Sequence, residues 1–357
     1  MIWTYVIIAV LLMAAELMYF KIADKCNIID KPNERSSHST IVLRGGGVIF
    51  AISILFWMAL QMVNGEWLMV KDYLPFIIGL VLICGVSFWD DVKSLPDSVR
   101  LVAQFAAMIL MLLCLRVKDV QWFNDWAWYW QVLIGIAALI VVVGATNVYN
   151  FMDGINGITA GYSLAVLVPL ALLNSSIGLS SLRGTSGFIE ESFLVVTILG
   201  VLVFCWFNFR PKGKAKCFAG DVGSVGMAFI LLFMIGCLIM KTRDITWMIF
   251  LLVYGIDGCC TIIHRIMLHE NLGEAHRKHA YQLMANELGM SHVVVSLIYM
   301  GLQLIISLGF IYVCPNTVLA HWIYLIAALL VLCLAYVLFM KKYYHLHEEY
   351  LRGLQQH

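Results

Sequence analysis

The sequence predicts an all-α integral membrane protein, and its composition and its pattern of apolar stretches are the two observations that predict it. Of the 357 residues, 62% are hydrophobic and only 13% are charged, and the mean hydropathy is +0.89. Soluble domains carry about 25% charged residues, so this chain has too few polar side chains to cover a water-facing surface. The composition also excludes a disordered chain, and a net charge of +1 argues against a nucleic-acid partner.

The second observation is a succession of apolar stretches, each long enough to cross a bilayer. A hydrocarbon core of about 30 Å requires roughly 20 apolar residues, and only a helix satisfies its own backbone there. Eleven stretches qualify, although Pro169 could kink or end the sixth. They lie approximately at residues 2–20, 45–63, 73–89, 101–116, 128–146, 158–174, 192–207, 224–240, 246–264, 291–313 and 317–340. No internal repeat or separate soluble segment interrupts them, so residues 1–357 are expected to form one polytopic domain.

The basic residues predict the orientation, because Lys and Arg accumulate in cytoplasmic loops. Of the 23 Lys and Arg residues, 17 fall on the side of loop 21–44 and six on the other side. That side is therefore expected to be cytoplasmic, and an odd number of crossings then places the N-terminus outside and the C-terminus inside. Most carboxylates outside the stretches share that side, so we expect the active site on the cytoplasmic face.

Adjacent carboxylates, Asp90 and Asp91, end the third stretch. Two neighbouring carboxylates near lipid raise each other's pKa unless a cation neutralises them. Such oxygen ligands suit Mg²⁺, which takes one or two carboxylates together with substrate phosphates. A solvated helix end would explain the pair equally well. Arg100 begins the next stretch and is either a phosphate ligand or a simple positive-inside anchor.

Two further loops on this side carry polar residues beside glycines. Asn147, Asn150, Asp153 and Asn156 recur at every third position, so a helical turn would align them on one face, where they favour a polar ligand over simple helix capping. Gly154, Gly157 and Gly161 permit tight turns and close approach of a ligand. Before the eighth stretch, residues 220–224 read Gly-Asp-Val-Gly-Ser, an anion-binding arrangement in which Asp221 could hold a metal that bridges to phosphate.

The fourth loop is rich in histidine and basic residues. It contains His264, His269, His276, His279, Arg265, Arg277 and Lys278. Arg and His suit recognition of phosphate or sugar hydroxyls. Zinc is the alternative, but no Cys partner accompanies the histidines. Asp257 lies inside the ninth stretch, and a structural counter-charge, a neutral acid and a ligand all remain open for it.

Seven motifs in a fixed order resemble those of the polyprenyl-phosphate N-acetylhexosamine-1-phosphate transferases of glycosyltransferase family 4. The motifs are D-K-P-N-x-R-x-x-H (30–38), R-G-G-G (44–47), D-D-V (90–92), N-x-x-N-x-x-D-G-I-N-G (147–157), F-A-G-D-V-G-S (218–224), D-x₇-R (257–265) and H-R-K-H-A-Y-Q (276–282). That family includes the enzyme that makes the first lipid intermediate of peptidoglycan and enzymes that initiate O-antigen and capsule synthesis. The resemblance covers residues 30 to 283.

The resemblance implies a transferase that moves a sugar 1-phosphate from a UDP-N-acetyl sugar to undecaprenyl phosphate and releases UMP. It also implies Mg²⁺ as cofactor, with Mn²⁺ as an alternative, and a multi-pass location among the lipids of a bacterial inner membrane. A homodimer is left open. The product would be the first lipid-diphospho-sugar intermediate of a cell-surface polysaccharide.

The resemblance also implies roles for individual residues. Asp90 would position or deprotonate the lipid phosphate, with Asp91 supporting it and the metal. Asp221 and Asn150 would coordinate Mg²⁺, making Asp90, Asp91 and Asp221 the catalytic set and Asp221, Asn150 and Asp91 the metal set. Asp153 and Asn156 would lie near the uridine, and Arg277 and His279 would contact the sugar or its phosphate. The full set of implied substrate-binding residues is His38, Arg44, Arg100, Asn147, Asp153, Asn156, His276, Arg277 and His279.

The last motif departs from the form D-R-x-H-x-H-H found in many members. His276 replaces the Asp, and Ala280, Tyr281 and Gln282 replace the final residues. This form resembles the subgroup that acts on UDP-sugars such as N-acetylfucosamine or N-acetylquinovosamine in O-antigen synthesis. Replacing His by Tyr and Gln should change which sugar hydroxyls are recognised, which argues against N-acetylglucosamine and muramyl-pentapeptide donors. The sugar itself stays open.

Two other classes of membrane protein compete with this interpretation. A transporter or flippase of a lipid-linked or anionic solute would keep charges near the bilayer midplane and often shows repeats. Here the carboxylates cluster on one face, and only Asp257 and Glu16 among them lie within stretches. A phosphatidyl-type transferase would need D-G-x-x-A-R, and the sequence from Asp153 reads D-G-I-N-G-I. The sugar-phosphate transferase is therefore the leading hypothesis.

Overall fold

The computed structural model describes residues 2–30, 41–117, 125–176, 181, 183–274 and 276–355 and is almost entirely helical. The elements, in chain order, are α1 (Ile2–Lys25), β1 (Ile29–Asp30), β2 (Val42–Leu43), α2 (Val48–Val63), α3 (Trp67–Val92), α4 (Asp97–Val117), α6 (Trp128–Phe151), α7 (Ile158–Asn174), α9 (Glu191–Asn208), α10 (Gly220–Thr242), the 3₁₀ helix η1 (Ile245–Leu251), α11 (Leu252–Met267), α12 (Ala280–Asn286), α13 (His292–Tyr312) and α14 (Val318–Gln355).

The predicted membrane architecture is confirmed. In the described part of the chain, nine helical segments are long and apolar enough to cross a membrane, and two shorter apolar helices, α2 and α7, complete the set. These eleven segments coincide with the eleven stretches expected from hydropathy. Pro169 lies inside α7 without ending it. The chain is therefore an all-α, multi-pass membrane protein.

The ends of several helices differ from the hydropathy limits. The ninth segment opens with η1, where Asp244 Oδ1 accepts hydrogen bonds from the Thr246 backbone N–H at 2.9 Å and from its hydroxyl at 2.6 Å. Helix α14 continues to Gln355, well past the expected end at residue 340. Hydropathy detects only the apolar part of a helix, whereas the backbone bonds of α14 continue through polar residues that pack on α12.

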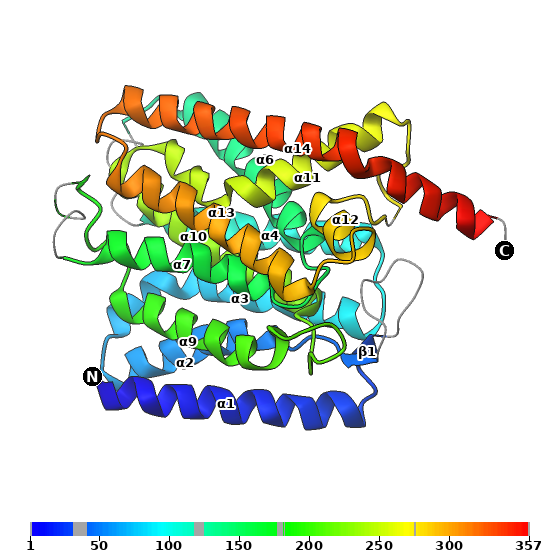
Figure 1. Cartoon of the computed structure of the whole chain (residues 1–357). Helices are drawn as coiled ribbons and strands as arrows, with labels where there is room; N and C mark the ends of the chain where they lie inside the picture. Colours follow the sequence, from blue (N-terminus) through cyan, green and yellow to red (C-terminus); the bar gives the residue numbers. More distant parts are fainter. Residues whose placement is uncertain are drawn as a thin grey trace.

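The bundle is organised around α10, the most deeply buried of the candidate spans. Helices α2, α3, α4, α6 and α7 all contact it, and Figure 1 shows α1 and α14 on opposite outer sides. Aromatic side chains fill its contact with α3: the Phe76 ring stacks on Phe229 and Phe233 at centroid distances of 5.2 and 4.1 Å. Buried rings of this size contribute strongly to packing. Helix α10 is thus held rigidly, and so is the polar turn at its start.

The first and last described residues lie at opposite ends of the bundle, as an odd number of crossings requires (Figure 1). The strand β1, the helix α12 and the C-terminal part of α14 share one end, which we call the β1 end. The assignment of that end to the cytoplasm stays a prediction.

A small β element at the β1 end was not expected from the sequence. Strand β1 pairs antiparallel with β2, with Ile29 opposite Leu43, and Leu43 also forms a parallel bridge to Cys217. Strands of two residues carry no recognisable periodicity, so hydropathy could not reveal them. Their effect is to tie the segment after α1 to the segment before α10.

Candidate active site

Two glycine-rich motifs far apart in the sequence pack directly against each other at the β1 end. The backbone N–H groups of Gly46 and Gly47 donate to the carbonyls of Phe218 and Ala219 at 2.9 and 3.0 Å. A Cβ on Gly47 would lie 2.3 Å from the Cα of Gly223. The motifs at 44–47 and 218–224 therefore form one backbone unit, and their glycines serve this close contact.

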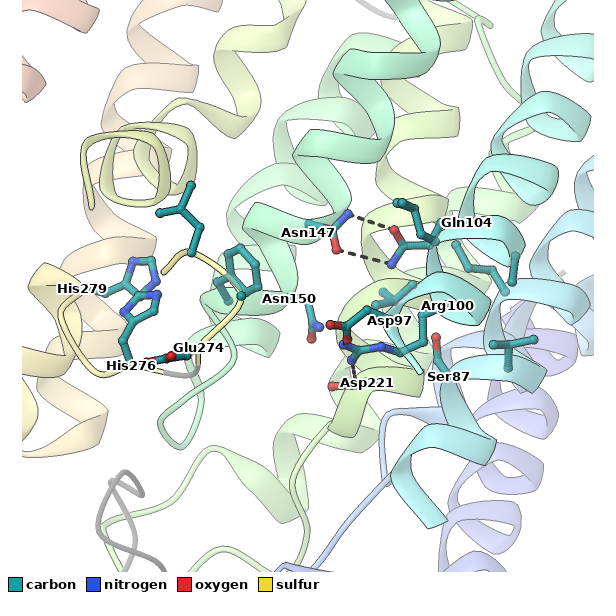
Figure 2. Close-up of a pocket in the computed structure, with 18 of the residues that line it drawn as sticks. Ser87, Asp97, Arg100, Gln104, Asn147, Asn150, Asp221, Glu274, His276 and His279 are labelled. Atoms are coloured by element: carbon teal, nitrogen blue, oxygen red, sulfur yellow. Dashed lines mark hydrogen bonds and ion pairs between the residues drawn. The ribbon is translucent and has the colours of Figure 1, made fainter. Parts of the chain in front are cut away.

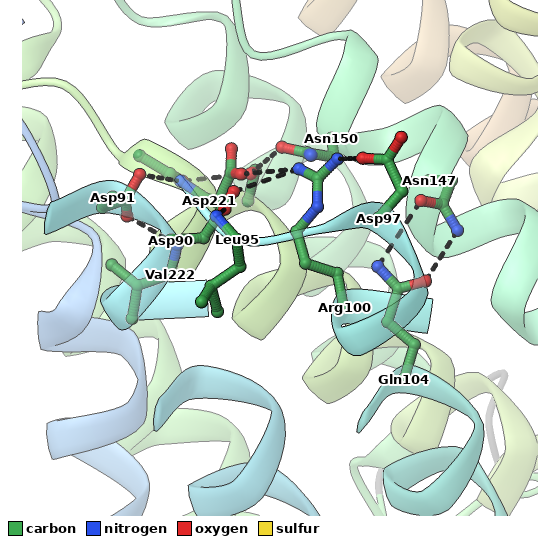
Figure 3. Close-up of polar contacts among 12 residues, drawn as sticks. Asp90, Asp91, Leu95, Asp97, Arg100, Gln104, Asn147, Asn150, Asp221 and Val222 are labelled. Atoms are coloured by element: carbon green, nitrogen blue, oxygen red, sulfur yellow. Dashed lines mark hydrogen bonds and ion pairs between the residues drawn. The ribbon is translucent and has the colours of Figure 1, made fainter. Parts of the chain in front are cut away.

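Asp91 anchors that unit to α3. Its fully buried carboxylate accepts hydrogen bonds from the backbone N–H groups of Asp221 at 2.9 Å and Val222 at 3.0 Å (Figure 3). It also accepts Arg44 Nε at 2.7 Å. The first turn of α10 is thus an anion site as expected, but the anion is the protein's own Asp91. Both oxygens of Asp91 are occupied within the protein, so the geometry makes it an anchor for Asp221 and Arg44.

Asp90 points the other way and joins an ion-pair cluster. Its carboxylate accepts the Leu95 backbone N–H at 2.6 Å and Arg100 Nη1 at 3.0 Å. The same Arg100 nitrogen lies 3.5 Å from Asp221, and a second Arg100 nitrogen pairs with Asp97. One guanidinium therefore pairs with three carboxylates from three segments of the chain (Figure 3).

A cavity of about 460 Å³ opens beside this cluster. Figure 2 shows Arg100 and Asp221 on one side of it and His276 and His279 on the other. The residues that line it are Ile83, Val86, Ser87, Asp97, Arg100, Leu101, Ala103, Gln104, Asn147, Asn150, Phe151, Asp221, Val225, Leu272, Gly273, Glu274, His276, His279 and Gln282. Its polar lining is concentrated at the β1 end, and its volume falls within the range of small-molecule sites.

The asparagines of α6 enter this cavity, as the sequence predicted. Asn147 exchanges hydrogen bonds with Gln104 of α4, at 2.9 Å from its amide nitrogen and 3.4 Å to its oxygen. Asn150 Oδ1 accepts the hydroxyl of Ser224 at 2.5 Å. These bonds fix both amides against α4 and α10. Gln104 was missed at the sequence level, although a glutamine one turn after Arg100 in an apolar stretch is a signal that could have found it.

His276 and His279 reach the cavity from the segment between α11 and α12. The His279 Nδ1 lies 3.3 Å from Asp257 Oδ1, which leaves its buried Nε2 facing the cavity without a partner among the described residues. Asp257 also accepts the backbone N–H groups of Ala280 at 3.0 Å and Tyr281 at 3.3 Å. Of the three alternatives for Asp257, the geometry supports the structural one: it caps α12 and orients His279.

The protonation state of His276 follows from its surroundings. Burial, reinforced by the neighbouring His279, lowers the pKa of His276 to about 3, so its ring is neutral near pH 7. Its Nδ1 accepts the Lys278 backbone N–H at 3.4 Å, so Nε2 carries the proton. His276 can therefore donate a hydrogen bond to a ligand hydroxyl or phosphate oxygen.

Four predicted substrate-binding residues do not line the cavity. One of them, Arg44, pairs with Asp91 instead. Asn156 donates to the carbonyls of Arg210 and Pro211 at 2.9 and 3.1 Å and so holds the turn between α6 and α7 to the segment after α9. Asp153 accepts the Thr159 hydroxyl, and burial raises the pKa of Asp153 to about 7. Arg277 turns away, toward Glu287 at 2.7 Å. His38 lies outside the described residues.

The glycines of the same turn also serve protein packing. A Cβ on Gly154 would lie 2.3 Å from the Tyr281 hydroxyl, which donates to the Phe151 carbonyl at 2.9 Å. Gly157 has a φ of +84° and faces the Phe209 ring. These two glycines leave room for side chains of the protein. Of the altered last motif, Tyr281 is buried against α6, and Gln282 lines the cavity.

The oxygen ligands at the β1 end suit Mg²⁺. Among the described residues, no three His, Cys, Asp or Glu side chains could hold a metal together. Asp221, 19% exposed, faces the cavity beside Asn150, and Asp90 shares its arginine. Mg²⁺ characteristically takes one or two carboxylates and completes its shell with water and substrate phosphates. The donor set therefore fits Mg²⁺ bound with a phosphate ligand.

Fold and site together define a class: a multi-pass membrane protein with a polar cavity, paired carboxylates and basic side chains at one end of its bundle. Residues 73–243, slightly under half of the chain, match the family described as "Glycosyl transferase family 4", and the match supports the family that the sequence motifs resemble. The match covers α3 to α10, which carry Asp90, Asp91, Arg100, Asn147, Asn150 and Asp221.

Relatives with assigned names support the same family. The chain is 26% identical to a "Probable undecaprenyl-phosphate N-acetylglucosaminyl 1-phosphate transferase" of Bacillus subtilis, over 82% of this chain and 77% of the relative. It is 28% identical to a "Phospho-N-acetylmuramoyl-pentapeptide-transferase" of Thermotoga maritima, over 52% and 57%. It is 24% identical to an "Undecaprenyl-phosphate alpha-N-acetylglucosaminyl 1-phosphate transferase" of Escherichia coli K12, over 64% and 60%. The last two alignments span less than two thirds of the relative.

Proposed function

We propose that this protein transfers an N-acetylhexosamine 1-phosphate from a UDP-sugar to undecaprenyl phosphate and releases UMP. The observation that carries the proposal is one cavity in which Asp221, Asn150 and Arg100 face His276 and His279 from the opposite side. Both substrates carry phosphate, one in water and one anchored in lipid, so their reaction belongs at the membrane surface. The relatives named for undecaprenyl-phosphate substrates support the lipid acceptor.

The reaction is a phosphoryl transfer. An oxygen of the lipid phosphate attacks the sugar-bearing phosphorus of the donor, a new P–O bond forms, and the bond to the uridylate oxygen breaks so that UMP leaves. Such reactions depend on positioning and on neutralising charge more than on covalent catalysis. Asp221 and Asn150 would hold Mg²⁺, which supplies positive charge to the donor pyrophosphate.

The other residues of the cavity bind and orient. Arg100 pairs with Asp90 at 3.0 Å and with Asp221 at 3.5 Å, so binding of a phosphate and a metal would let it exchange carboxylate for phosphate oxygens. Asp90 would then position the acceptor phosphate. His276 can donate from Nε2, and the Nε2 of His279 has no partner among the described residues. Together with Gln282, these two histidines would form hydrogen bonds with the sugar.

The donor sugar belongs to the same proposal. The histidine-poor form of the last motif favours a UDP-N-acetyl sugar other than N-acetylglucosamine, such as N-acetylfucosamine or N-acetylquinovosamine. We place the enzyme in a bacterial inner membrane with the β1 end in the cytoplasm, where nucleotide sugars are made.

The test uses the purified protein with undecaprenyl phosphate, Mg²⁺ and a panel of UDP-N-acetyl sugars, with UMP release as the readout. Asp221→Asn should reduce UMP release by at least about 100-fold, because a metal-binding carboxylate is lost. Asp125→Asn, an exposed position outside the cavity, is the matched control and should retain activity. Absence of UMP with every donor, from a folded protein, would refute the transferase and favour the transport alternative.

A further inference from the structure

Helix α14 is much longer than a membrane crossing requires. Its 38 residues span about 57 Å at 1.5 Å per residue, whereas a bilayer core of about 30 Å needs roughly 20 residues. The surplus lies at its C-terminal end, which Figure 1 shows projecting past the bundle beside α12. We call residues 341–355 the tail of α14.

One face of this tail is buried against the segment that carries the cavity histidines. His347 is only 1% exposed, and its Nδ1 lies 3.0 Å from Glu287 Oε1. Tyr350, one turn further, lies under the Arg277 guanidinium at 4.1 Å. Tyr344, one turn before, packs its ring against His264 at 4.6 Å. Spacings of three residues place all three on one helix face.

Glu287 connects the tail to the cavity. It follows α12, its side chain is buried, and one of its oxygens accepts both His347 Nδ1 and Arg277 Nη2, the latter at 2.7 Å. Arg277 lies in the chain between His276 and His279, which both line the cavity. The ion pair with Glu287 therefore holds Arg277 in place, and with it the backbone that directs His276 and His279 into the cavity.

We propose that the tail of α14 is a positioning element for donor recognition, in which His347, through Glu287 and Arg277, sets the placement of His276 and His279 in the cavity. The inference rests on the proposed function for its substrate and adds residues beyond the segment that resembles the family. Among the described side chains, Asp90 and Arg100 on the acceptor side of the cavity make no contact with His347, Glu287 or Arg277.

The test compares three variants. His347→Ala removes the hydrogen bond to Glu287, and His347→Asn restores an N–H donor near the Nδ1 position. His345→Ala is the matched control, because His345 lies two residues away on the exposed face of the same helix. Steady-state UMP release gives KM for the UDP-sugar and for undecaprenyl phosphate separately, and thermal unfolding confirms that each variant is folded.

We expect His347→Ala to raise the donor KM about tenfold, as loss of one hydrogen bond to a charged group implies, with little change in the acceptor KM. His347→Asn should recover most of the loss, and His345→Ala should match wild type. Equal effects of the two alanine variants, or an equal rise of both KM values without rescue, would overturn the proposal.

A second measurement does not depend on activity. Hydrogen–deuterium exchange of residues 268–279 should accelerate in His347→Ala and not in His345→Ala. Unchanged exchange would overturn the positioning role even in an active enzyme. If wild-type protein released no UMP while exchange responded as expected, the proposed reaction would fail and the structural coupling would stand.

Discussion

Replacing Asp91 by Asn distinguishes an anchor, as the geometry indicates, from a catalytic or metal-binding group, as the sequence predicts. The buried carboxylate accepts Arg44 Nε at 2.7 Å and the backbone N–H groups of Asp221 and Val222 at 2.9 and 3.0 Å. Asparagine keeps one acceptor oxygen and turns an amide donor toward the others. Arg44 then loses its nearest counter-charge, and at least one donor loses its partner.

The expected loss is large because the group is buried. Removing one member of a buried ion pair costs about 3–5 kcal/mol. Asp97→Asn is the matched control: its side chain is 82% exposed, and an exposed pair with Arg100 contributes about 0–1 kcal/mol. We therefore expect Asp91→Asn to lower the unfolding midpoint far more than Asp97→Asn.

Both variants would be unfolded thermally in detergent, and UMP release would be measured on the folded fraction. The anchor role predicts that stability and activity fall together in Asp91→Asn, because Asp221 and Arg44 lose their fixed positions. A variant as stable as Asp97→Asn that has lost all activity would refute this reasoning and assign Asp91 directly to the chemistry.

Two further predictions concern backbone and pH. Gly220→Ala should lower the free energy of unfolding by about 1–3 kcal/mol, because Gly220 has a φ of +69° and an added Cβ would lie 2.5 Å from Asp91 Oδ2. Gly255→Ala is the control and should be neutral in the same unfolding assay, because an added Cβ there would meet no atom within 4 Å. Burial raises the pKa of Asp153 to about 7, so between about pH 4 and 7 the folded protein holds a proton that the unfolded chain has released, and stability falls as pH rises. Asp153→Asn should flatten that part of the curve of unfolding midpoint against pH, and an unchanged slope would refute the assignment.

Much of the site's location could be predicted from the sequence. Polar residues in an apolar chain concentrate at the ends of its spans, so hydropathy brings Asp90, Asn150 and Asp221 to one end of the bundle. The order of the motifs then indicates the family, and the comparisons support it. Length and apolarity likewise determined the number of crossing segments, including the one that contains Pro169.

Tertiary structure alone decided which way each side chain points. Asp90 and Asp91 are neighbours in sequence, yet one joins Arg100 beside the cavity and the other caps α10 through Val222, 131 residues away. Arg277 likewise turns outward between two histidines that turn inward. Such choices depend on contacts between segments distant in the chain, which leave no local pattern in the sequence. The span of a helix is a local property of its residues, whereas the partner of a buried charge is a property of the packed bundle.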